Sequence, residues 1–122
     1  MKNNNFYRVM EVEGFEKDLI KIARKYPSSI DLVASLFERF EEGNIEGNDI
    51  RGLKLKGDKV FKTRLENPDA NKGKSGGFRV IWYLVTSDNE IYPLTIYSKN
   101  EQDDIPNREI ISLISKRVSN LV

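Results

Sequence analysis

GKSGGFRVIWYLVTSDNEIYPLTIYSKNEQDDI, residues 73–105, contains two alternating apolar runs separated by a short polar stretch. The first run covers residues 78–85 and the second covers 91–97. The Ser-Asp-Asn sequence between them has the composition of a tight turn. This pattern predicts a β-hairpin, with Arg79 near the start of its first strand and Lys99 just beyond the end of its second.

Outward from this hairpin, the periodicity of apolar residues predicts five more elements. They are a first strand, two amphipathic helices, a strand that precedes the hairpin, and a final helix. Their expected residues are, in order, 6–12, 15–26, 33–40, 60–65 and 106–121. The segment 44–57 is rich in glycine and is expected to be a loop.

Two sets of polar residues are expected to act at helix N-termini. Ser28 and Asp31 have the spacing of a capping pair at the start of the second helix. The carboxylates of Glu101, Asp103 and Asp104 precede the final helix, where negative charge is favourable. Both sets are therefore interpreted as helix-stabilising groups.

The order strand, helix, helix, three strands, helix indicates an α+β fold. We expect an antiparallel sheet with the N-terminal helix hairpin packed on one face and a C-terminal helix. The chain of 122 residues has the length of one domain, so residues 1–122 are expected to form a single unit.

Composition excludes several classes of chemistry. The chain has no cysteine and no histidine, which rules out disulfides, thiolate metal sites and histidine acid–base catalysis. Zinc sites with cysteine or histidine ligands are therefore not expected. No apolar run reaches the roughly 20 residues of a membrane helix, and the N-terminus lacks the pattern of a signal peptide. These features predict a cytoplasmic protein with no membrane partner.

The net charge of +1 conceals a strong asymmetry along the chain. Residues 9–49 carry a net charge of −5, whereas residues 51–82 carry +6. A basic side on a small domain favours a polyanionic partner such as RNA. From charge alone, ordinary solubilising residues on helices and strand edges explain the same asymmetry equally well.

Strand parity assigns several of these cations to one face of the sheet, because alternate residues of a strand point the same way. Tyrosines fall among them, and aromatic rings can stack on bases while cations bind phosphates. Packing within the sheet is the simpler role for the tyrosines. The candidate RNA-binding set consists of Lys62, Arg64, Lys72, Lys74, Arg79, Tyr83, Tyr97 and Lys99. Trp82 has the opposite parity to Arg79 and is assigned to the core.

Two linked motifs, KGKSGGFRVIWY and LTIYSKNEQDDI, resemble the RelE/ParE superfamily of bacterial toxins and are closest to its HigB-like branch. The resemblance implies a RelE-like fold and a toxin of a type II toxin–antitoxin system. It also implies cleavage of mRNA on the ribosome without metal or cofactor. The implied partners are mRNA on the ribosome and a cognate antitoxin, of helix-turn-helix type and encoded in an adjacent gene, with no small-molecule substrate.

The resemblance also implies roles for individual residues. Arg79 matches the arginine that contacts the scissile phosphate, and Lys99 matches a cation at the end of the last strand. Lys62 and Arg64 match basic residues of the preceding strand, which bind phosphate or transfer protons. Tyr97 is a weaker companion of Lys99. Lys72 and Lys74 match the basic loop of the HigB-like branch. After Lys99 the chain turns acidic and departs from the RelE pattern, which leaves the general acid unassigned.

The expected chemistry is attack of an RNA 2′-hydroxyl on the adjacent phosphate, giving a 2′,3′-cyclic phosphate. An ordinary lysine has a pKa of about 10.4 and is a weak base at neutral pH. Most of the rate would then come from electrostatic stabilisation and from positioning.

Two alternatives of different class remain open. The ParE-like branch shares the fold and inhibits DNA gyrase without being a nuclease. A catalytically inactive binding module is the other possibility. Cations spread over three strands and a loop favour RNA cleavage over the ParE-like alternative.

Overall fold

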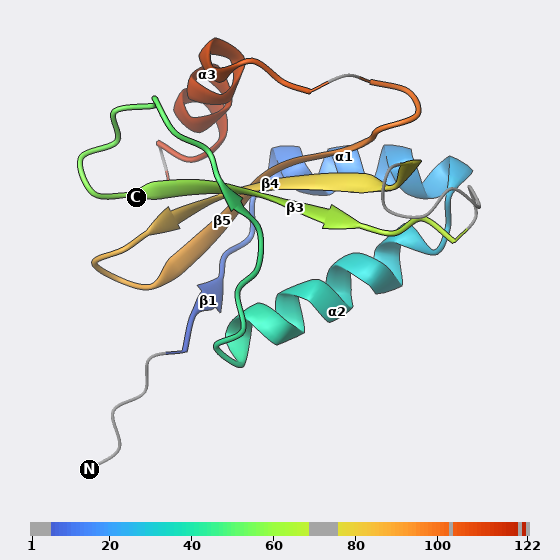
Figure 1. Cartoon of the computed structure of the whole chain (residues 1–122). Helices are drawn as coiled ribbons and strands as arrows, with labels where there is room; N and C mark the ends of the chain where they lie inside the picture. Colours follow the sequence, from blue (N-terminus) through green and yellow to red (C-terminus); the bar gives the residue numbers. More distant parts are fainter. Residues whose placement is uncertain (1–5, 69–75, 103, 120, 122) are drawn as a thin grey trace.

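The computed structural model describes residues 6–68, 76–102, 104–119 and 121. Its elements follow the order β-α-α-β-β-β-β-α (Figure 1). Their bounds are β1 Arg8–Val9, α1 Glu13–Lys25, α2 Ser29–Glu41, β2 Asn48–Asp49, β3 Lys59–Leu65, β4 Phe78–Val85, β5 Glu90–Ser98 and α3 Asn107–Arg117. The α+β fold class is therefore confirmed, with one short strand more than expected.

The predicted hairpin forms the middle of the sheet. In the described part of the chain the sheet has five strands in the order β1-β5-β4-β3-β2, and β4 pairs antiparallel with both β3 and β5. Residues 86–89 make the turn between β4 and β5, and Asn89 adopts a left-handed conformation there with φ 55°. The central position of β4 fixes where Arg79 lies.

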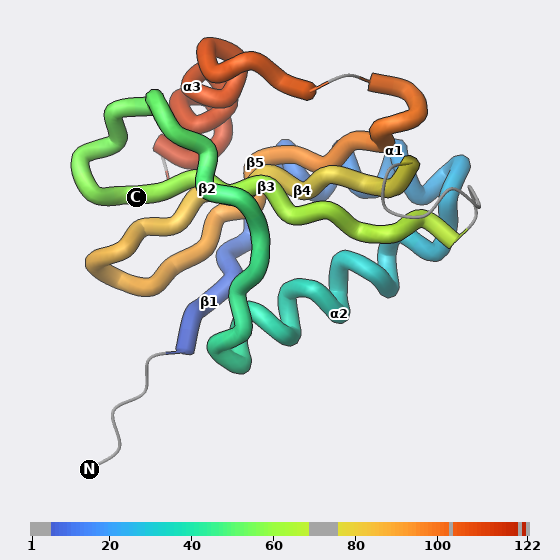
Figure 2. Tube along the Cα trace, in the orientation of Figure 1, coloured from blue at the N-terminus to red at the C-terminus, as the bar shows by residue number. Residues whose placement is uncertain are grey.

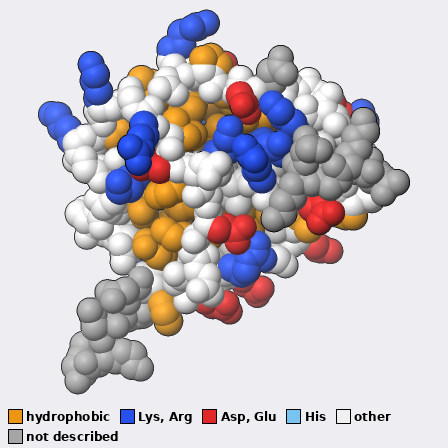
Figure 3. Space-filling model, viewed as in Figure 1, with side chains coloured by type: hydrophobic (Ala, Val, Ile, Leu, Met, Phe, Trp, Pro, Cys, Tyr) orange, Lys and Arg blue, Asp and Glu red, His pale blue; other side chains and the backbone are white. Residues whose placement is uncertain are grey.

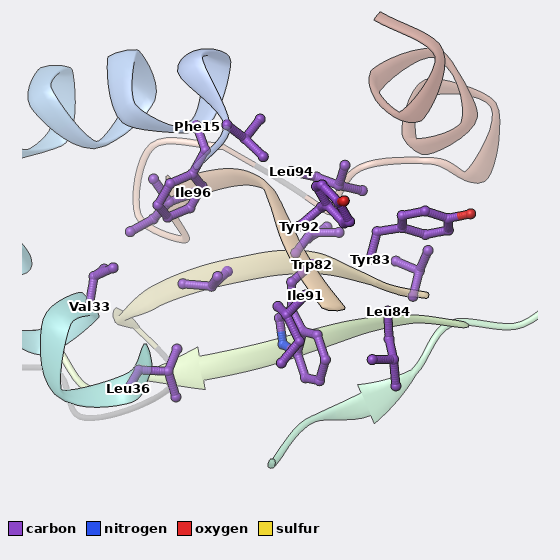
Figure 4. Close-up of a cluster of buried hydrophobic side chains, with 14 of the residues drawn as sticks. Phe15, Val33, Leu36, Trp82, Tyr83, Leu84, Ile91, Tyr92, Leu94 and Ile96 are labelled. Atoms are coloured by element: carbon purple, nitrogen blue, oxygen red, sulfur yellow. The ribbon is translucent and has the colours of Figure 1, made fainter. Parts of the chain in front are cut away.

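One layer of the core lies between the sheet and the first two helices and is built around Trp82. The Trp82 ring stacks on Phe61 of β3 and packs against Phe40 of α2, with both centroid distances 4.6 Å. Its indole N–H donates a hydrogen bond of 2.9 Å to the Thr63 hydroxyl. Trp82 is fully buried, which confirms its expected place in the core (Figure 4).

The helix pair α1 and α2 has the expected apolar face. Phe15 of α1 lies 5.7 Å from Phe37 of α2, and Leu36 and Phe40 of α2 are fully buried. The expected cap of α2 is absent, because the side chain of Ser28 makes no capping hydrogen bond at that position. Packing of its apolar face is what holds α2 in place.

Two edge strands differ from expectation. Within the predicted strand 6–12 only Arg8–Val9 pairs, and it runs parallel to β5, so the sheet is mixed rather than antiparallel. The chain turns into α1 directly afterwards, which shortens β1. At the other edge, Asn48–Asp49 pairs with β3 although it was expected to be loop. Both of its residues are polar and exposed, so no apolar alternation marked this strand.

The helix α3 lies on the side of the sheet opposite α2 (Figure 1). Arg117 at its end donates hydrogen bonds of 2.7 Å to the Leu94 carbonyl of β5 and to the carboxylate of Asp18 in α1. The connection from β5 to α3 runs on the same side as α3 (Figure 2). No helix in the described part of the chain has the length and hydropathy that a bilayer span requires.

Candidate nucleic-acid interface

The register of the three long strands brings the predicted cations together. Arg79 is the cross-strand partner of Arg64 on one side and of Tyr97 on the other. Lys62 lies one step along the same face, opposite Ile81. Directly opposed residues of neighbouring strands have Cβ atoms about 4.5–5.5 Å apart, so these side chains form one group.

This group lies on the sheet face away from α2. Phe78 and Trp82 have the opposite parity to Arg79, and Trp82 packs against Phe40 of α2. Lys99 follows β5 directly, and its backbone N–H donates to the Gly77 carbonyl at 2.9 Å. We refer to Lys62, Arg64, Arg79 and Lys99 as the basic cluster. In the space-filling view, Lys and Arg side chains gather on this side of the molecule beside acidic side chains (Figure 3).

Arg79 is a buried residue, with only 4% of its surface exposed, whereas a cation in an open cleft would be largely exposed. Burial is the main cause that lowers the pKa of the Arg79 guanidinium, and the charge of Arg64 lowers it further. The nearby Tyr97 and Asp104 act in the opposite direction and raise that pKa. An arginine keeps its charge despite such a shift. A desolvated cation interacts more strongly with a phosphate than an exposed one does, so the burial suits a phosphate-binding role.

Asp104 is the residue that sequence reasoning missed. Its Oδ1 atom lies 3.3 Å from Lys62 Nζ and 3.5 Å from Lys99 Nζ. The same oxygen accepts a hydrogen bond of 3.2 Å from the Tyr97 hydroxyl. Three donors from two strands and the segment after β5 thus converge on one carboxylate oxygen.

The expected role of the acidic segment as helix N-terminal charge is corrected by this arrangement. Asp104 is held by the basic cluster, and Glu101 pairs with Lys25 and accepts a hydrogen bond from the Tyr26 hydroxyl. Asp103 lies outside the described residues. Local spacing carries no signal for these contacts, because they depend on how the segment after Lys99 folds back over the sheet.

The electrostatics of this contact follow from its neighbours. Burial alone would raise the pKa of Asp104. The hydrogen bond and charge of Lys62, then the Tyr97 hydroxyl and the charge of Lys99, outweigh burial and hold that pKa below its usual value. Burial, followed by the charge and hydrogen bond of Asp104, raises the pKa of Tyr97. At neutral pH, Asp104 is therefore a carboxylate and Tyr97 a neutral hydrogen-bond donor.

Tyr83, a candidate for base stacking, is not brought to the basic cluster. It lies about four residues further along β4, roughly 13 Å from Arg79 by ordinary strand geometry. Its hydroxyl donates a 2.6 Å hydrogen bond to Asp58, and burial followed by that bond raises the pKa of Tyr83 to about 12. Figure 4 shows Tyr83 and Trp82 on opposite sides of β4. Tyr83 is therefore not part of the proposed site.

The candidates Lys72 and Lys74 lie outside the described residues.

Gly77 fixes the start of β4 beside the cluster. A Cβ atom at this position would lie 1.9 Å from the Leu65 carbonyl oxygen, which is backbone and cannot rotate away. We expect Gly77→Ala to destabilise the protein by about 1–3 kcal/mol, the usual cost of overpacking. Chemical denaturation monitored by the fluorescence of Trp82 measures this change.

Gly57→Ala is the matched control, since nothing lies within 4 Å of the corresponding Cβ position. Gly57 has a positive φ of 98°, so some backbone cost remains in that control. If Gly77→Ala unfolded at the same denaturant concentration as the wild type, the close approach of β3 and β4 at this point would be contradicted.

No family model matches the chain. Among solved structures, it is similar to a mutant of the E. coli toxin RelE in the free state, in which two arginines are replaced by alanine. The two chains are 18% identical, with a TM-score of 0.43, and the match covers 96% of this chain and 97% of that one.

Proposed function

We propose that the protein is the toxin of a type II toxin–antitoxin system, from the HigB-like branch of the RelE/ParE superfamily. In this proposal residues 1–122 form one toxin domain that cleaves mRNA on the ribosome and so inhibits translation. The convergence of Lys62, Lys99 and Tyr97 on one carboxylate oxygen, beside the cross-strand partners Arg64 and Arg79, carries the proposal. The resemblance of the two hairpin motifs to the superfamily supports it.

Each residue of the cluster has a proposed role. Arg79, positioned at the centre by β4, binds the scissile phosphate and stabilises the charge that develops on it. Lys99 binds the same phosphate from the end of β5. Lys62 and Arg64 on β3 bind neighbouring phosphates or take part in proton transfer. The neutral hydroxyl of Tyr97 donates a hydrogen bond to a phosphate oxygen.

The reaction that fits these groups needs no external reagent. The ribose 2′-oxygen attacks the adjacent phosphorus, and the bond from phosphorus to the 5′-oxygen breaks. The 2′-hydroxyl proton goes to a base, and the leaving 5′-oxygen gains a proton. The products are a 2′,3′-cyclic phosphate and a 5′-hydroxyl. Positioning and charge stabilisation supply most of the rate, because the chain has no histidine.

The proposed partners follow from this function. We propose mRNA on the ribosome as substrate and a helix-turn-helix antitoxin, encoded in an adjacent gene, as the neutralising partner. Lys72 and Lys74, which precede β4 in the sequence, are proposed to bind RNA as well. Neither a metal nor a small cofactor is part of the proposal.

A translation assay tests this function. Purified protein added to a reconstituted translation system should cleave the translated mRNA, and the same mRNA should stay intact when ribosomes are omitted. A supercoiling assay with DNA gyrase should show no inhibition. Gyrase inhibition without mRNA cleavage would replace the proposal with the ParE-like alternative, and absence of both activities would favour a binding module.

A further inference from the structure

The carboxylate of Asp104 stands where an RNA phosphate is expected to bind. Its Oδ1 atom has Lys62 Nζ, Lys99 Nζ and the Tyr97 hydroxyl within 3.3, 3.5 and 3.2 Å. Lysine ammonium groups and a neutral phenol are also groups that bind a phosphate oxygen. Asp104 thus occupies the three donors, Lys62, Lys99 and Tyr97, that a bound nucleic acid would use.

The contact of Asp104 with Lys62 and Lys99 can be broken at little cost to the fold, so that another anion can replace the carboxylate. The Asp104 side chain is 57% exposed, whereas the side chains of Lys62 and Lys99 are 18% and 31% exposed. An ion pair with one well-solvated partner contributes little to stability, so losing it costs the fold little. The lysines and Tyr97 are carried by strands or lie directly after one, whereas Asp104 is in the connection to α3.

The charge of Asp104 also acts beyond its direct contacts. It stabilises the charged form of Arg79, which lies at the centre of the cluster, against the lowering effect of burial and of Arg64. Like charges held close together repel each other, and an anion among them relieves that repulsion. In the free protein this anion is Asp104, and in the complex it would be a phosphate.

We infer that Asp104 is an internal substitute for the substrate phosphate, which partly neutralises the basic cluster in the free protein and must be displaced by RNA. This inference rests on the proposed function and adds a regulatory step to the same site. Binding of RNA is a competition between two anions for Lys62, Lys99 and Tyr97. The free protein therefore binds stray RNA weakly, and a ribosome that presents the mRNA in place favours the exchange.

The test is the affinity of the free protein for a short RNA that it cannot cleave. A fluorescent oligoribonucleotide with 2′-O-methyl groups throughout lacks the attacking hydroxyl, and its anisotropy reports binding without ribosomes. We expect Asp104→Asn to lower the Kd roughly three- to tenfold at low salt, since the competing ion pairs are lost. The difference should shrink at high salt, where charges are screened.

Two further variants serve as controls. Asp104→Glu retains the competing charge, and its Kd should stay closer to the wild-type value than that of Asp104→Asn. Glu109→Gln removes another exposed charge, from the first turn of α3, and should change the Kd less than about twofold. Thermal unfolding of each variant verifies that it is folded.

A Kd for Asp104→Asn that is unchanged or higher than wild type would overturn the inference, as would the absence of measurable binding by either protein. A loss of ribosomal cleavage on the order of 10² in Asp104→Asn without tighter binding would also overturn it, because that result assigns Asp104 as a general base. The proposed function is judged separately, by whether the wild-type protein cleaves translated mRNA.

Discussion

Replacing Arg79 by alanine is expected to reduce the rate of ribosome-dependent mRNA cleavage by a factor on the order of 10²–10³. Arg79 lies at the centre of the basic cluster, with Arg64 and Tyr97 as its cross-strand partners. Its guanidinium is buried, so its interaction with a phosphate is weakly screened by water. Single-turnover cleavage of mRNA held on stalled ribosomes measures the effect on the chemical step.

Two variants separate a catalytic effect from a structural one. Arg79→Lys retains the charge and loses the planar fork of donors, so it should recover part of the lost rate. Lys21→Ala removes an exposed cation from α1, outside the cluster, and should cleave like the wild type. Full activity in a folded Arg79→Ala protein would show that the reaction takes place elsewhere.

Trp82→Ala should destabilise the protein by about 3–5 kcal/mol, the range found for aromatic residues removed from a core. Trp82 is fully buried, lies between Phe40 and Phe61, and donates a hydrogen bond to Thr63. Its loss leaves a cavity between β4 and α2 and an aromatic stack without its middle ring. Urea denaturation followed by circular dichroism gives the change in the free energy of unfolding.

Ile111→Ala is the matched control for this change. Ile111 is 46% exposed on α3, so its truncation removes little buried surface and should cost less than about 1 kcal/mol. If Trp82→Ala unfolded at nearly the same urea concentration as Ile111→Ala, the packing of α2 on the sheet as described would be wrong.

The central part of the fold could be predicted from the sequence because its signals are local. Long apolar runs in β4 and β5 and the polar turn between them specify a hairpin. The alternation of side chains along a strand then places Trp82 in the core and Arg79 on the other face. The helices α1 and α2 carry a strong apolar periodicity. The edge strand β2, made of Asn48–Asp49, has no such pattern and is defined only by its pairing with β3.

The candidate site was predictable only in part, for the same reason. Strand register placed Arg64, Arg79 and Tyr97 together as parity suggested. Parity assigns a residue to one face of a strand but does not specify its position along that strand. Tyr83 has the parity of Arg79 but lies further along β4, where its hydroxyl donates a hydrogen bond to Asp58. Asp104 lies in the connection between β5 and α3, and its contacts with Lys62 and Lys99 have no signal in the local sequence.

The chemistry of the cleaved RNA ends tests the central claim most directly, namely that the basic cluster cuts mRNA by attack of its own 2′-hydroxyl. Translated mRNA treated with the wild-type protein should carry a 2′,3′-cyclic phosphate on the upstream fragment and a 5′-hydroxyl on the downstream fragment. The same ends should be lost with Arg79→Ala. Fragments that carry a 5′-phosphate and a 3′-hydroxyl, or intact mRNA under conditions of active translation, would contradict the account.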